Sequence, residues 1–344
     1  MTKHNKEADR LKKIVEAFPQ TTVTVLGDLV VDEFVFGEIS RVSREAPVLI
    51  LKHLERVALP GGGANAIYNL AELGVNVLPV GVVGQDEAGK LLLQQFKKKR
   101  IPVTGILRDK NYSTVTKTRI LAGLPHTWRQ QVVRIDREPS EELSRHLTRE
   151  LILAGREYAR ASDALLVSDY GYGTATPQIL DAVRQKSGLS DIPVTLDSRY
   201  RLLEFSGITA ATPNEAEVEE ALRTRVGENW NKLVSAGEEV VRRLKLESLV
   251  ITRGRDGMVA FTRRHKPVDI PCFGSEEVAD VTGAGDTVIA TFTAALAAGA
   301  STEEAAQLAN YAGGIVVMKR GTATVSRSEL LHALEQAPPM TRSH

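Results

Sequence analysis

The chain has 344 residues, of which 42% are hydrophobic and 25% charged, and its formal net charge is +1. This balance gives no electrostatic reason to expect nucleic acid or an anionic membrane as a partner. The single cysteine, Cys272, excludes an intrachain disulfide, and we expect it to be packed and inert. Because no run of about 18 apolar residues occurs and the N-terminus lacks the apolar core of a signal peptide, we expect a cytoplasmic protein.

Residues 1–20 are charged and amphipathic, which predicts a helical extension. One large domain is then expected over 21–335, and 336–344 is typical of a flexible tail.

Within the large domain, apolar runs alternate with helical patterns. Strands are predicted at 22–28, 76–84, 163–170, 192–198, 207–214 and, as a strand–turn–strand unit, 246–261, with helices at 62–74, 86–99, 176–188 and 215–223. Strands that are apolar on both faces and alternate with helices favour a parallel sheet covered on both sides, an α/β fold.

Two segments, 30–57 and 114–136, instead alternate apolar with polar residues. This pattern is typical of antiparallel strands with one wet face. The segments could form one small sheet that stands off the main domain as a lid, or two separate surface hairpins.

The motif DVTGAGD, residues 280–286, directly precedes an apolar helical stretch. Gly283 and Gly285 permit positive φ and leave backbone N–H groups uncovered at a helix start, where a phosphate or oxyanion binds. Asp286 beside such a site suits a base that takes a proton from a hydroxyl attacking the phosphate. The alternative is an ordinary Asp cap after a glycine loop.

Three further stretches add polar groups. PGGGAN (60–65) is a second glycine turn that opens a helix, or a plain tight turn. Asp28 and Asp32 end the first strand, where open α/β sheets bind ligands and where carboxylates suit sugar hydroxyls. Asn214 and Glu217 share a helix face that could orient hydrated Mg²⁺, or they could be a helix cap and a surface acid.

PGGGAN, PNEAE (213–217) and DVTGAGD occur in the order found in the PfkB, or ribokinase-like, carbohydrate kinases, which the chain resembles from about Thr22 to Leu334. It is most similar to the D-glycero-β-D-manno-heptose-7-phosphate kinase branch, through SRVSREAPV, TVTKTRIL, QQVVRID and LLVSDYGYG. The resemblance implies a three-layer α/β/α sandwich with a mostly parallel central sheet and a small β lid. In the bifunctional form of this branch a nucleotidyltransferase half follows the kinase, and we expect the chain ending at His344 to lack that activity.

The resemblance also implies roles for individual residues. Asp286 would be the catalytic base, with the N–H groups of Gly283, Ala284 and Gly285 as anion hole. The sugar pocket maps onto Asp28, Asp32, Gly62, Gly63, Asn65 and Asp169. Lid cations that could reach a sugar phosphate, or could be solvated surface, are Arg41, Arg44, Lys117, Arg119 and Arg134. The nucleotide side maps onto Asn214, Thr252, Arg253, Gly254, Gly257, Asn310 and Gly313, with Glu217 holding Mg²⁺ through water.

The implied reaction is transfer of phosphate from ATP with Mg²⁺, with a monovalent cation as a possible activator, to O1 of D-glycero-D-manno-heptose 7-phosphate, a step toward ADP-heptose for the lipopolysaccharide core. A homodimer through the lid is expected. Tyr172 stands where the branch has a lysine, which leaves open another PfkB-type kinase acting on fructose, ribose, a phosphosugar or a nucleoside. A binding regulator without catalysis is disfavoured by the intact glycine turn and Asp286.

Overall fold

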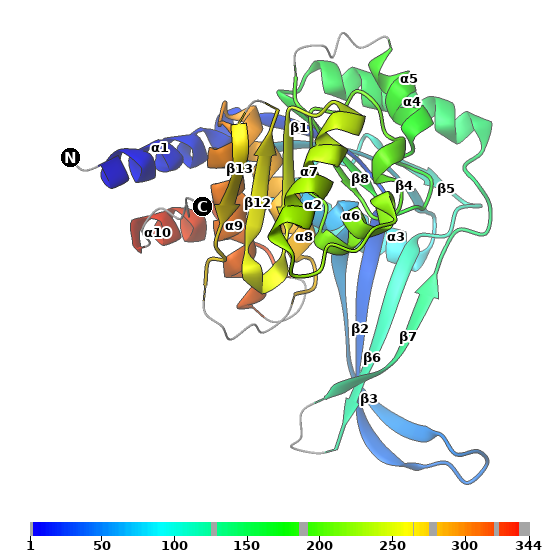
Figure 1. The fold of residues 1–344 in the computed structure, drawn as a ribbon. Coiled ribbons are helices and arrows are strands. Elements are labelled where there is room, and N and C mark those ends of the chain that lie inside the picture. Colours follow the sequence, from blue (N-terminus) through cyan, green and yellow to red (C-terminus); the bar gives the residue numbers. More distant parts are fainter. Residues whose placement is uncertain are drawn as a thin grey trace.

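A nine-stranded, mostly parallel sheet forms the centre of the molecule (Figure 1). The computed structural model describes residues 3–124, 129–185, 192–263, 265–274, 281–319 and 323–336. The strands lie in the spatial order β13 (His265–Ile270), β12 (Met258–Thr262), β11 (Ser248–Thr252), β10 (Ala210–Ala211), β9 (Val194–Ser198), β8 (Ala164–Asp169), β1 (Thr22–Gly27), β4 (Asn76–Gly84) and β5 (Ile106–Asp109). Only the β11–β12 and β12–β13 pairings within it are antiparallel.

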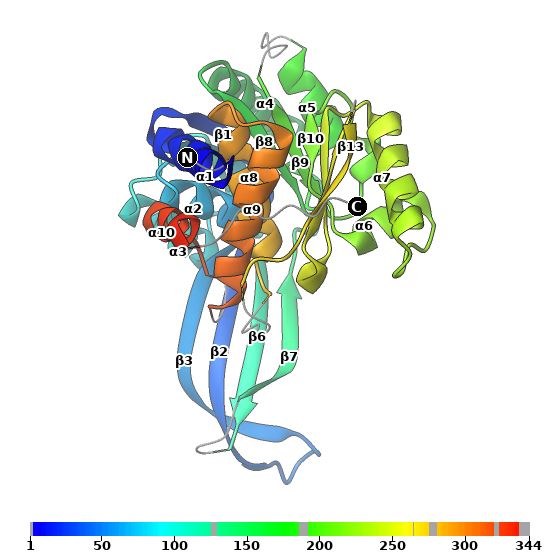
Figure 2. The ribbon, with the colours of Figure 1, turned by 60° about the vertical axis from the view of Figure 1, so that its left-hand side comes forward.

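Helices cover both faces of this sheet, because its strands are apolar on both sides. In β1, Val23 and Val25 belong to one hydrophobic core and Leu26 to the other. Figure 2 shows helices on either side of the sheet. The first face is covered by α1 (Lys3–Ala17), α2 (Gly63–Glu72), α3 (Glu87–Lys98), α8 (Ala284–Ala297), α9 (Thr302–Val317) and α10 (Arg327–Gln336). The second is covered by α4 (Arg145–Arg160), α5 (Pro177–Arg184), α6 (Glu215–Leu222) and α7 (Trp230–Leu244). The predicted α/β/α sandwich is confirmed.

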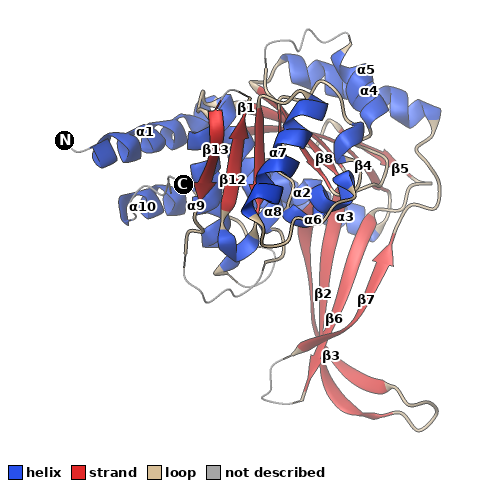
Figure 3. Cartoon of the chain, viewed as in Figure 1, coloured by secondary structure: helices blue, strands red, loops and turns tan. Residues whose placement is uncertain are grey.

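A separate four-stranded sheet projects from the main domain (Figure 3). Its order is β3 (Leu49–Gly62), β2 (Leu29–Val42), β6 (Val115–Gly123) and β7 (Gln130–Arg137). Both segments with alternating polarity therefore join one sheet, which we call the lid sheet, rather than forming two hairpins. The central pair, β2 and β6, is parallel, unlike the expected antiparallel arrangement, because the two strands leave the main domain side by side.

Two other expectations need correction, and two fall outside the described residues. The strand predicted over 207–214 is only the two residues of β10, between Gly207, whose φ is 61°, and Pro213, which has no N–H to donate. Cys272 is exposed rather than packed. Asp280, the first residue of the DVTGAGD motif, and the tail beyond residue 336 lie outside the described residues. None of the described helices is long and apolar enough to cross a membrane.

Candidate active site

The second glycine motif along the chain, which contains Gly283 and Gly285, forms a left-handed turn that starts α8. Gly283 is the N-cap residue with φ 79°, and every residue from Asp286 to Ala295 is buried. The N–H of Ala284 donates to the carbonyl oxygen of Val281 at 3.2 Å. Among the described residues, no acceptor is recorded for the N–H groups of Gly283 and Gly285, and a Cβ added at Gly285 would meet open space. The turn can therefore accept an anion at the positive end of the helix.

Asp286 lies in the first turn of α8 and is only 3% exposed. Its Oδ2 accepts a hydrogen bond from Nδ2 of Asn65 at 2.9 Å, and its Oδ1 accepts one from the hydroxyl of Tyr170 at 2.8 Å. Burial raises the pKa of Asp286 to about 7, although both hydrogen bonds favour the ionised form. A carboxyl group with this pKa can take up a proton near neutral pH.

The first glycine motif along the chain, PGGGAN (60–65), brings α2 against α8. Gly62 has φ 53° and ψ −133°, a conformation open essentially only to glycine, and a Cβ there would lie 2.9 Å from Val30. Asn65 follows in the first turn of α2. Its amide also lies 3.4 Å from the carbonyl oxygen of Gly283, and Asn69 accepts a hydrogen bond from Thr287 at 3.0 Å. The two glycine motifs, far apart in sequence, are thus joined at Asp286.

Asp28 and Asp169, expected to bind sugar hydroxyls, instead support the loop after β8. The carboxylate of Asp28 has no exposed surface and accepts backbone hydrogen bonds from Tyr170, Tyr172 and Thr174 at 2.9–3.0 Å. Asp169 accepts hydrogen bonds from Ser198 and forms an ion pair with Arg201. In this arrangement neither carboxylate is open to a ligand, because both side chains are buried and their oxygens already accept these hydrogen bonds.

One face of the lid sheet carries charges toward the site. Asp32 on β2 stands beside Lys117 on β6, and two residues further along β6 Arg119 stands beside Arg134 on β7. Arg119 donates to Oδ1 of Asp32 at 2.5 Å. Lys117 lies over the rings of Tyr170 and Tyr172, at 5.1 and 5.7 Å, and burial lowers its pKa.

Arg41 and Arg44 are not brought to this cluster within one chain. Arg41 lies nine residues along β2 from Asp32, a run of about 30 Å at roughly 3.3 Å per residue. It pairs with Ile50 at the far end of the lid sheet, and Arg44 follows in the exposed connection to β3. The length of the two strands, which the sequence pattern left undefined, separates these cations from the others.

The expected nucleotide residues mostly surround one cavity of about 170 Å³ on the other side of Asp286. Thr252, Gly254, Gly257, Asn310 and Gly313 line it together with Ala284 and Gly285. Arg253 points elsewhere and forms an ion pair with Glu215 at 2.9 Å. Asn214 and Glu217 form a capping box at the start of α6, the alternative that the sequence left open.

Two neighbouring residues were missed by the sequence analysis. Tyr170 was not expected to bond Asp286. Asp197 lies near the end of the next strand, β9, where its position after an apolar run could have been noticed. Burial, together with the neighbouring carboxylates of Glu217 and Asp286, raises the pKa of Asp197 well above its usual value. No group of three or more metal-ligating side chains occurs among the described residues.

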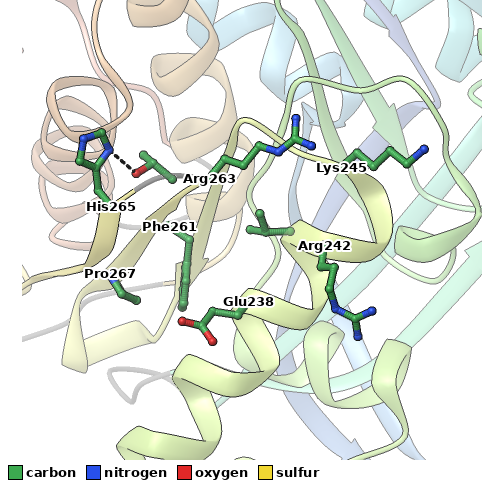
Figure 4. A pocket seen from close by; sticks show the side chains of 9 residues that line it. Glu238, Arg242, Lys245, Phe261, Arg263, His265 and Pro267 are labelled. Atoms are coloured by element: carbon green, nitrogen blue, oxygen red, sulfur yellow. Dashed lines mark hydrogen bonds between the residues drawn. The ribbon is translucent and has the colours of Figure 1, made fainter.

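A larger basic cavity of about 330 Å³ lies apart from this site, between α7 and the β12–β13 edge. Arg242, Lys245 and Arg263 line it, but Figure 4 shows their charged ends spread rather than convergent. Arg242 is also paired with Glu239. We therefore place the candidate site at Asp286.

Comparison with known proteins agrees with this geometry. The model of the pfkB family carbohydrate kinases matches residues 21–329. The chain belongs to this family. It is accordingly a phosphotransferase that acts on a sugar hydroxyl, and ribokinase-like kinases use ATP with a metal ion.

Curated relatives are named bifunctional protein HldE. The one from Geobacter sulfurreducens is 39% identical over 90% of this chain and 62% of its own length, and the one from Pelobacter propionicus 38% identical over 91% and 63%. The chain thus spans less than two thirds of the length of these relatives.

Arabidopsis thaliana ribokinase complexed with ribose and ATP has a TM-score of 0.71 at 21% identity over 92% of this chain and 99% of that one. Phosphofructokinase-2 from Escherichia coli has a TM-score of 0.72 at 18% identity over 92% and 98%. These two likenesses show the ribokinase-like fold.

Proposed function

We propose that this pfkB-family kinase transfers the γ-phosphoryl group of ATP to O1 of D-glycero-D-manno-heptose 7-phosphate. The observation that carries the proposal is the position of Asp286. It stands between a glycine turn with uncovered N–H groups and a lid face that carries Lys117, Arg119 and Arg134. The first feature suits a migrating phosphoryl group, and the second suits a substrate that already bears a phosphate.

In the proposed reaction Asp286 accepts the proton of the O1 hydroxyl. O1 then forms a bond to the γ-phosphorus while the bond from that phosphorus to the β–γ bridging oxygen breaks, and ADP leaves. The N–H groups of Gly283 and Gly285 stabilise the negative charge on the transferred group, whereas the N–H of Ala284, also expected in the anion hole, is already bonded to Val281. Closure of the lid sheet over the sugar keeps water from the phosphoryl group. Because Asp286 acts in its ionised form, turnover should rise with pH up to about 7.

Asp197 and Glu217 are the carboxylates that would hold Mg²⁺, Glu217 through water, because the capping-box bond uses only one of its oxygens, Oε2. Their mutual repulsion contributes to the raised pKa of Asp197, and a divalent cation would relieve it. Two carboxylates without a complete protein cage are what Mg²⁺ uses when nucleotide phosphates and water supply its other ligands. The ion would neutralise phosphate charge. A monovalent cation also stays a prediction, which turnover in potassium against sodium salts tests.

The heptose assignment draws on the relatives named HldE and on the lid cations. The alternative is another PfkB-type sugar, phosphosugar or nucleoside substrate. Tyr172 favours this alternative, because its hydroxyl lies 3.3 Å from Glu138 and the position carries no positive charge of its own. Lys117, held over the Tyr172 ring, supplies a cation at the same place and so favours the heptose phosphate.

A homodimer through the lid is supported by exposed apolar side chains. Of the twelve large hydrophobic residues that are exposed in the described part of the chain, eight lie in the lid: Val42, Val48, Leu49, Leu54, Leu124, Val132, Val133 and Ile135. Such a concentration marks a surface for a partner, here a second copy of the chain. Sedimentation of the wild type against Val133→Asp tests it, and a monomeric wild type would contradict it.

The substrate is tested by an ADP-release assay with heptose 7-phosphate, ribose, fructose, fructose 6-phosphate and adenosine, each at matched concentration. We expect the highest kcat/KM with heptose 7-phosphate, and phosphorus NMR of the product should show a second phosphate on O1. Turnover confined to unphosphorylated sugars or to adenosine would overturn the heptose assignment.

A further inference from the structure

Tyr170, a residue that the proposed reaction does not use, contacts four separate parts of the site. Its hydroxyl donates to Oδ1 of Asp286 at 2.8 Å, and the ammonium group of Lys117 lies 5.1 Å from its ring centre. Its backbone N–H donates to Asp28 at 2.9 Å, and a Cβ on Gly62 would lie 3.2 Å from its ring. The side chain is therefore fixed from the main domain, the lid sheet and the first glycine motif.

These contacts control the orientation of the Asp286 carboxylate. One oxygen receives the Tyr170 hydroxyl and the other receives the Asn65 amide. Each oxygen keeps a second lone pair, so the plane defined by the two donors fixes where a proton can be accepted. Loss of one donor would free the carboxylate to rotate and would remove stabilisation of its ionised form.

We propose that Tyr170 is a positioning residue that orients Asp286 and connects it to the lid sheet through Lys117. The inference rests on the proposed role of Asp286 as base. Lys117 belongs to β6, so any movement of the lid sheet relative to the main domain changes the contact between its ammonium group and the Tyr170 ring. Asp286 is then held in its working orientation only when the lid cation is in place.

Other groups also face Asp286 and must be held constant in a test. Asp32 on β2 disfavours its ionised form and Lys117 on β6 favours it, while ionised Asp286 in turn raises the pKa of Asp197 on β9. Tyr172 is a matched control for Tyr170. It also lies beside Lys117, but its hydroxyl bonds Glu138 rather than Asp286.

The test compares Tyr170→Phe with Tyr172→Phe in the full-length chain. In Tyr170→Phe we expect the acid limb of the kcat/KM profile to move up by about half to one pH unit, since a typical hydrogen bond is worth that much. We also expect a fall in kcat of about tenfold with little change in KM for ATP. In Tyr172→Phe the limb should stay where it is in the wild type. An unmoved limb in Tyr170→Phe would overturn the proposal.

A second readout needs no sugar. In protein with ¹³C-labelled aspartate carboxyls, the Asp286 signal is assigned by its loss in Asp286→Asn, and its titration midpoint should be higher in Tyr170→Phe than in the wild type. If no sugar is phosphorylated by the wild type, the proposed function fails while this measurement still decides the inference. Lys117→Met, made in the wild type and in Tyr170→Phe, separates the direct effect of the Lys117 charge from an effect through Tyr170. Equal changes of the midpoint in the two backgrounds would overturn the connection to the lid. If Tyr170→Phe does not fold, Tyr170→Met, which also lacks the hydroxyl donor, takes its place.

Discussion

The two sides of Asp286 are built in different ways. The cavity that we propose for the nucleotide, called the nucleotide cavity below, is lined mainly by glycine and small apolar residues, including Gly285, Val288 and Gly313. The other side, which we propose binds the sugar that accepts the phosphate, is called the acceptor side below. It carries charged side chains, such as Asp32 and Lys117 on two lid strands. The first side depends on local backbone conformation, whereas the second depends on how separate segments pack. A single carboxylate at their boundary can therefore serve both, and changes on each side should have separable effects.

The largest expected effect is that of Asp286→Asn, which removes the proton acceptor common to both sides. We expect kcat to fall by about 10³-fold, within the range for loss of a general base, with ATP still bound. Single-turnover assays and nucleotide titration measure the two quantities. Asp9→Asn, in the exposed part of α1, is the matched control and should keep wild-type turnover. Wild-type turnover in Asp286→Asn would exclude it as the base.

The same variant, Asp286→Asn, also tests the raised pKa of Asp286 through the pH dependence of protein stability. The pKa of Asp286 is about 7 in the folded chain and near its ordinary value of 3.8 when unfolded, mainly because burial disfavours the charge. The unfolded chain binds fewer protons between these values, so stability falls as pH rises from about 4 to 7, by up to about 4 kcal/mol. We expect Tm of Asp286→Asn minus Tm of the wild type to grow over this window. A constant difference would mean that Asp286 titrates at its ordinary pKa.

On the acceptor side, Arg119→Gln should weaken binding of a phosphorylated sugar. Loss of a charge-assisted hydrogen bond predicts a 10- to 100-fold rise in KM for that substrate. KM for ATP should not change, because the nucleotide cavity lies on the other side of Asp286. Arg108→Gln, on the exposed part of β5 in the main sheet, is the control. An equal rise in both KM values would contradict the separation of the two sides.

The difference between the sides also explains what the sequence could predict. The glycine turn before α8 could be predicted from local signals, since Gly283 and Gly285 before an apolar helix already indicate a turn with uncovered amides, whereas the nucleotide residues were implied only by the family resemblance. The central sheet followed from apolar runs such as 22–28 and 163–170, because strands buried on both faces are apolar throughout.

The acceptor side could not be predicted in the same way. Asp28 and Asp169 follow buried strands, as sugar-binding residues do, yet backbone amides and Arg201 take up their oxygens. Which donors meet a carboxylate depends on the course of a loop through space, and no short-range pattern reports it. The contact between Tyr170 and Asp286 joins residues 116 positions apart for the same reason.

The smallest expected effect is that of Gly285→Ala on the nucleotide side. A Cβ at this position meets open space and the residue lies in the first turn of α8, so folding tolerates alanine and Tm should stay constant or rise slightly. The added methyl group would occupy the place where a phosphate approaches the N–H of Gly285. We therefore expect KM for ATP to rise about tenfold while KM for the sugar stays unchanged. Weakening one hydrogen bond to phosphate costs roughly 1.4 kcal/mol of binding free energy, which is a tenfold change in affinity. Unchanged KM for ATP at unchanged Tm would show that phosphate does not approach this amide, and the anion hole would then have to lie elsewhere along the turn.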